Sequence, residues 1–140
     1  MTTTITDLHI LAETLGVTLT HHNGGTPGWY HHPTRTISTR RKLGICDYKS
    51  ILAHELAHAY YRDEHCGRWN AKQERRADRL AARILIHPDE LHDAALWHRD
   101  DLHGLALDLE VTPHLIDIFM TLRNKEIYTW QATPGITIQL

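Results

Sequence analysis

The fold class that the sequence predicts is α+β, with a small N-terminal antiparallel sheet packed against a mainly helical body. Short, partly alternating segments separated by glycine and proline occupy residues 17–40, which is typical of strands. From Asp47 onward, apolar residues recur with the spacing of amphipathic helices. The chain has 140 residues, no internal repeat and no linker-like segment, so we expect a single domain over residues 1–140.

The first part of the chain is expected to form one helix and three strands. Residues 7–15 place their leucines on one face and are followed by Gly16, which predicts a short helix. The three strands are expected at residues 17–20, 28–31 and 34–40.

The third of these strands, TRTISTR, alternates only weakly and is therefore expected to be exposed. Such an edge could accept a substrate peptide by strand pairing, or it could be an ordinary edge protected by its arginines. Histidine pairs at 21–22 and 31–32 bracket a glycine-proline loop and could bind a second metal ion, although histidines on loops are more often solvated.

The second part of the chain is expected to form five helices. Asp47 is the expected N-cap of the first, and Asn70 with Gln73 forms a capping-box variant at the start of the second. Pro88 suits the first turn of the third. The helices are expected at residues 47–62, 70–86, 88–97, 102–109 and 112–123, and the tail from residue 127 is expected to be strand-like or loosely ordered.

Composition excludes several classes of protein. A net charge of −2 argues against a general nucleic-acid binder, which would usually be strongly basic. The N-terminus lacks the basic and apolar regions of a secretory signal, and no apolar run is long enough to span a membrane. Two cysteines, Cys46 and Cys66, are too few for a disulfide scaffold, so we expect free thiols and a cytoplasmic protein.

The stretch ILAHELAHAY, residues 51–60, contains the zinc signature H-E-x-x-H. His54 and His58 lie one helical turn apart and can reach one ion, whereas Glu55 points about 100° away and can act as a base. The chain has 13 histidines, and composition alone would produce on the order of 0.06 such matches. A third ligand is therefore needed to decide between a metal site and chance.

Glu74 in the following helix is the expected third ligand. If the two helices form an antiparallel hairpin about Cys66 and Gly67, His58 and Glu74 are each eight residues from the turn and lie level. Asp78, one turn after Glu74, could then accept an N–H from His54 or His58.

Other interpretations of these residues remain open at this stage. Glu74 and Asp78 could instead form ion pairs with the arginines of their own helix on an exposed face. His65 and Cys66 are also near the site, but they lie in the turn, where no helical geometry directs them to the ion. The metzincin class is excluded, because Tyr61 and Glu64 stand where it requires glycine and histidine.

The motif HELAH followed by ERRADRLAA resembles the ImmA/IrrE family of zinc metallopeptidases, whose pattern is H-E-x-x-H followed by E-x-x-A-[ND]. Glu74, Ala77 and Asp78 match this pattern, with aspartate in place of the commoner asparagine at 78. The segments ISTRRKLGICDYKSI and GLALDLEVTPHLIDIFMTLR are similar to the regions that flank the family's metal helices, so the resemblance covers about residues 5–123. It implies a gluzincin-like core and a bacterial or phage cytoplasmic endopeptidase that cleaves a partnered helix-turn-helix repressor.

The expected site lies in a helix pair at residues 46–87, followed by C-terminal helices at 101–124. One Zn²⁺ per chain would be held by His54, His58 and Glu74, with a fourth position left for water. Glu55 is the expected general base, and Tyr61 is a candidate donor to the oxyanion, although a role as a packed aromatic residue is favoured for it.

Two alternatives concern binding rather than catalysis. The protein could be a catalytically quiet zinc-binding regulator or sensor that acts by protein–protein binding, as in a toxin–antitoxin-like pair. The intact Glu55 favours the peptidase, since a binding module has no need of it. Residues 104–123 have helix-turn-helix spacing, but the second helix is apolar with only Arg123 basic, so we expect packing or repressor docking and no direct nucleic-acid binding.

Overall fold

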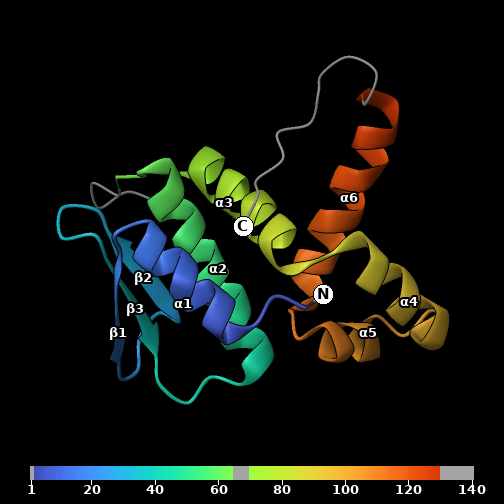
Figure 1. The fold of residues 1–140 in the computed structure, drawn as a ribbon, viewed down its shortest axis with the longest axis horizontal. Helices are drawn as coiled ribbons and strands as arrows, with labels where there is room; N and C mark the ends of the chain where they lie inside the picture. The colour runs from blue at the N-terminus through green and yellow to red at the C-terminus, as the bar shows by residue number, and fades with distance from the viewer. Residues whose placement is uncertain (1, 65–69, 130–140) are drawn as a thin grey trace.

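The computed structural model describes residues 2–64 and 70–129, and it confirms the α+β class. A three-stranded sheet lies on one side of a helical body (Figure 1). In chain order the elements are α1 (Ile5–Thr14), β1 (Thr18–His22), β2 (Gly28–His31), β3 (Thr36–Arg40), α2 (Ile45–Tyr61), α3 (Ala71–Leu85), α4 (Pro88–His98), α5 (Leu102–Leu109) and α6 (Pro113–Thr129).

The helix ends agree with the predictions in part. Asn70 caps α3 by accepting from the Gln73 N–H, and Pro88 stands in the first turn of α4, as expected. The prediction that Asp47 caps α2 is wrong: Gly44 is the N-cap, and Asp47 lies in the first turn, where its charge suits the helix dipole. Helix α6 runs to Thr129 rather than ending near residue 123, and residues 130–140 lie outside the described part.

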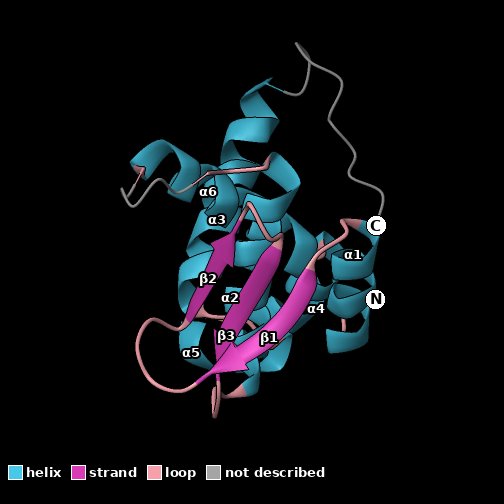
Figure 2. Ribbon diagram, turned by 90° about the vertical axis from the view of Figure 1, so that its left-hand side faces the viewer, coloured by secondary structure: helices cyan, strands magenta, loops and turns pink. Residues whose placement is uncertain are grey.

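The sheet is mixed rather than antiparallel, and its order is β1-β3-β2. β2 and β3 pair antiparallel, with Tyr30 opposite Ile37, whereas β1 and β3 are parallel, with Thr18 opposite Thr36. Figure 2 shows β3 between the two other strands. The expectation of an exposed third strand is therefore wrong, since TRTISTR contributes the central strand.

Burial of β3 depends on the histidines of the neighbouring strand. Ser38 and Thr39 are almost fully buried, and their hydroxyl groups meet the Nδ1 atoms of His22 (2.6 Å) and His21 (3.0 Å). The Nε2 atom of His22 also donates to the Thr26 carbonyl at 2.7 Å. The other histidine pair bonds hydroxyl groups too, through His31 to Thr34 and His32 to Tyr30. These contacts give both pairs a structural role and support no second metal site.

Helix α2 is the centre of the molecule, and it packs against α1, β2, β3 and α3. Where α2 meets α3, both helices bury small side chains: Ala53 and Ala57 on the first, Ala77 and Ala81 on the second are fully buried. Small residues allow helix axes to approach closely, so carboxylates and imidazoles from the two helices can reach one another. The connecting turn, including Cys66 and Gly67, lies outside the described residues.

Within the described ranges, no helix is long and apolar enough to cross a lipid bilayer.

The buried lysine of α2 allows a test of the packing of α2 on α5. Lys49 is 1% exposed, and its Nζ lies 2.9 Å from the Glu110 carboxylate at the end of α5. Glu110→Gln should lower the free energy of unfolding by about 1–3 kcal/mol, because it leaves a buried ammonium without its counter-charge; partial exposure of Glu110 keeps the loss modest. In a Lys49→Met background the same change should cost almost nothing. Urea unfolding of the four proteins measures both values, and equal losses in the two backgrounds would contradict the pairing.

Candidate metal centre

The structure brings the three predicted ligands together between α2 and α3. His54 Nε2 lies 3.1 Å from His58 Nε2 and 2.9 Å from a Glu74 carboxylate oxygen. The second Glu74 oxygen lies 3.2 Å from His58 Nε2. Within the described part of the chain, this is the one group of three or more such side chains whose ligand atoms could hold a metal ion.

The outer nitrogens of both imidazoles are held by carboxylates. His54 Nδ1 donates to Asp78 at 2.7 Å, and His58 Nδ1 donates to Asp63 at 2.8 Å. Because a carboxylate only accepts, each neutral ring carries its proton on Nδ1 and turns an Nε2 lone pair toward the centre. Two lone pairs and the Glu74 carboxylate then face one another at about 3 Å, which is unfavourable without a positive charge between them.

The pKa of His54 also indicates that the surroundings of this ring favour a positive charge. Burial opposes protonation of this ring, but the hydrogen bond to Asp78 and the charges of Glu55, Asp78 and Glu74 outweigh burial and raise its pKa to about 9. The donor set of two imidazoles and one carboxylate fits Zn²⁺, which is commonly held in catalytic sites by three such ligands.

Asp63 is a residue that the sequence analysis missed. It is 3% exposed, and it also forms an ion pair with the guanidinium of Arg76, which lies 4.1 Å above the Tyr61 ring. The sequence contains a signal for this role. A histidine that binds a metal through Nε2 needs an acceptor for Nδ1, and Asp63 follows the end of the same helix. The sequence predicts that Asp78 accepts an N–H from His54 or His58, and in the structure it accepts from His54.

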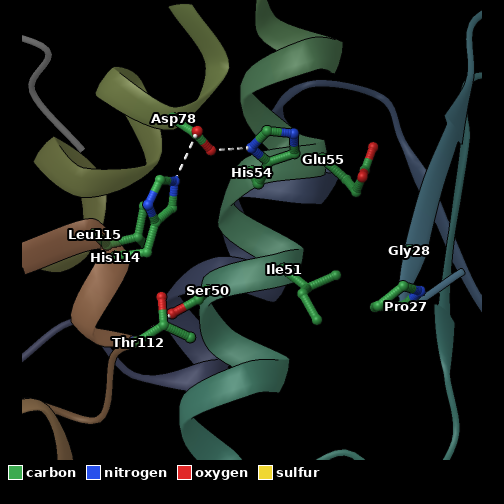
Figure 3. A pocket seen from close by; sticks show the side chains of 10 residues that line it. All are labelled: Pro27, Gly28, Ser50, Ile51, His54, Glu55, Asp78, Thr112, His114 and Leu115. Carbon is green, nitrogen blue, oxygen red and sulfur yellow. Dashed lines mark hydrogen bonds and ion pairs between the residues drawn. The ribbon is translucent and has the colours of Figure 1, made fainter. Parts of the chain in front are cut away.

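Glu55 lines a cavity of about 280 Å³ beside this centre. The wall on one side is β2 with Pro27 and Gly28, and on the other side it is α6 with His114 and Leu115 (Figure 3). Burial raises the pKa of Glu55 to about 7; the neighbouring His54 opposes this shift and the charge of Glu74 adds to it.

Gly28 allows β2 to lie close to α2. A Cβ atom at this position would lie 2.5 Å from Cγ2 of Ile51 and 3.4 Å from Cγ of Glu55. The absence of a side chain therefore sets the narrow distance between the edge strand and the glutamate.

The remaining predicted site residues lie elsewhere. Tyr61 is packed against the core and under Arg76, and it does not line the cavity, so its role as an oxyanion donor stays a prediction. His65 and Cys66 lie outside the described residues.

His114 is a cavity residue that the sequence does not single out. It lines the cavity and donates from Nε2 to the second oxygen of Asp78 at 3.1 Å.

Comparison with known protein families finds a match over residues 4–121 to the family described as Peptidase_M78, IrrE N-terminal-like domain. The chain belongs to this family. The match spans every element from α1 into α6, so the helix pair with its three candidate ligands lies inside a metallopeptidase-type domain. Comparisons with curated proteins and with solved structures find no match.

Metal analysis tests the ligand set of this Peptidase_M78 domain. Purified protein should bind about one Zn²⁺ per chain, and Glu74→Ala or His58→Ala should each weaken metal binding by at least about 100-fold, since each removes one of three ligands. His92→Ala, an exposed histidine on α4, is the matched control and should bind like the parent. Metal content and affinity are measured by mass spectrometry and chelator competition. Full occupancy in both site variants would refute the three-ligand centre.

Proposed function

We propose that the protein is a zinc-dependent endopeptidase, and that its biological substrate is a partnered helix-turn-helix repressor. The observation that supports the endopeptidase activity is the position of Glu55. This residue lines an open cavity immediately beside the three converging candidate ligands. Membership of a peptidase family supports it. The repressor as substrate rests on the resemblance of the sequence to the ImmA/IrrE family.

The chemistry divides between the ion and the chain. Zn²⁺ held by His54, His58 and Glu74 would polarise the scissile carbonyl and lower the pKa of water. Glu55 accepts the proton of the attacking water and passes it to the leaving amide nitrogen. Asp78 and Asp63 keep both imidazoles in the tautomer that ligation needs.

The peptide is expected to bind along β2 rather than along TRTISTR. β3 is central and has no free edge, whereas β2 pairs on one side only and borders the cavity at Gly28. An extended peptide that adds to this edge would pass over His54 and Glu55.

His114 is the donor that we expect to face the developing oxyanion. It lines the cavity and is held by Asp78 through Nε2, so Nδ1 is the ring atom left for the substrate. His114→Ala should therefore lower kcat by about 10²-fold with a smaller change in KM. Tyr61→Phe is the matched comparison and should change kcat less than twofold, because Tyr61 does not line the cavity. Steady-state kinetics of the two variants test which residue is the donor. A loss of kcat in Tyr61→Phe but not in His114→Ala would assign the donor role to Tyr61.

The test of the proposed function uses two protein substrates. Zinc-loaded protein should cleave unfolded casein or a purified helix-turn-helix repressor, and a chelator should stop cleavage until zinc is restored. Absence of zinc-dependent cleavage of both would overturn the peptidase assignment. A stable complex with the intact repressor, without cleavage, would support the binding regulator instead.

A further inference from the structure

A second cavity, of about 350 Å³, lies between α3 and α6 and continues from the catalytic one. The two cavities share Asp78 and His114, which are bonded to each other at the boundary (Figure 3). A polypeptide that leaves the metal centre on this side therefore enters the second cavity. We call this cavity the α3–α6 groove.

The α3 side of the groove carries two arginines. Arg75 and Arg79 are one turn apart, both are exposed, and neither forms an ion pair or hydrogen bond with another of the described residues. Arg76, between them in sequence, is by contrast engaged with Asp63 and Tyr61. The groove thus presents two guanidinium groups that are available for a ligand.

The two carboxylates that line the groove do not pair with these arginines. Asp78 is already bonded to two imidazoles, and Asp117 on α6 is a single exposed carboxylate that forms no ion pair with either arginine. Ile118 and Leu122, which like Asp117 line the groove from α6, are half-buried and provide an apolar surface. Guanidinium groups on one helix and an apolar surface on the other suit a segment that contains both a carboxylate and an apolar side chain.

We propose that the α3–α6 groove is a substrate subsite that selects an acidic residue, next to an apolar one, a few residues from the scissile bond. This inference rests on the proposed endopeptidase function and names a determinant of its specificity. Continuity with the catalytic cavity identifies the occupant as the substrate polypeptide, and the two unpaired arginines identify the acidic residue that it would carry. An exposed arginine–carboxylate pair is modest in strength, so each arginine should change kcat/KM by about 3- to 10-fold.

The experiment compares cleavage of a peptide library, made by digesting a whole proteome, by the zinc-loaded parent protein and by charge-reversal variants. The parent should enrich Asp and Glu at one position on one side of the cleaved bond. Arg79→Glu should abolish this enrichment, and Arg75→Glu/Arg79→Glu should replace it with Lys and Arg. Lys72→Glu, an exposed basic residue of the same helix outside the groove, is the matched control and should keep the acidic preference.

A second readout does not depend on turnover. A fluorescent acidic peptide from the enriched set should bind Glu55→Gln protein about 3- to 10-fold more tightly than it binds Glu55→Gln/Arg79→Glu protein, as measured by anisotropy. Cleavage without an acidic preference, or a preference that survives Arg79→Glu or disappears in Lys72→Glu, would overturn the subsite and leave the peptidase function intact. No zinc-dependent cleavage of the library, of casein or of the repressor would overturn both.

Discussion

Glu55→Gln should lower the rate of peptide hydrolysis by about 10²- to 10⁴-fold while the protein retains its zinc. The amide has nearly the shape of the carboxylate, but it cannot accept the proton of the attacking water. Glu55 is 8% exposed and lines the cavity beside the three candidate metal ligands without belonging to them. The change therefore separates the base from the metal centre. Steady-state cleavage rates and zinc content of the same preparations provide the measurement.

Glu13→Gln, an exposed glutamate on α1, is the matched control for this variant and should cleave like the parent protein. Two results would contradict the assignment. Undiminished cleavage would mean that another group accepts the proton, and loss of zinc together with activity would mean that Glu55 is part of the metal centre.

Asp63→Ala should produce the largest loss of stability among the site variants, about 2–4 kcal/mol, together with a 10- to 100-fold weaker affinity for zinc. Asp63 accepts from the buried His58 and forms an ion pair with Arg76, whose Nε is also buried. Without the carboxylate, the Nδ1–H of His58 loses its acceptor and the ring loses its orientation. Partial exposure of Arg76 limits the loss, because its guanidinium can turn to water.

Urea unfolding of the metal-free protein and chelator competition of the folded protein measure the two effects separately. Asp93→Ala on the exposed face of α4 is the control and should shift neither value appreciably. An Asp63→Ala protein with parental stability and parental zinc affinity would remove Asp63 from the metal centre.

The predictable part of the fold is the part that depends on local spacing. The apolar pattern located α2 through α5 closely because helical periodicity is a property of neighbouring residues. The order of the strands was not predictable, because the pairing of Thr18 with Thr36 joins segments separated by the whole of β2. TRTISTR looked exposed because its serine and threonines are polar, and only the cross-strand bonds to His21 and His22 explain their burial.

The sequence by itself predicted which side chains meet between α2 and α3. His54 and His58 are one turn apart in any helix, and the equal distances of His58 and Glu74 from the turn place them level in an antiparallel pair. Asp78 follows from the same argument, since it lies one turn beyond Glu74.

Only the tertiary structure decided what surrounds those candidate ligands. Asp63 approaches His58 after the chain has left α2, and His114 reaches Asp78 from a helix thirty-six positions further along. The edge of β2 and the α3–α6 groove likewise depend on how distant segments pack. Helical spacing determines which side chains share a face of one element, whereas contacts between elements depend on packing that no local pattern encodes.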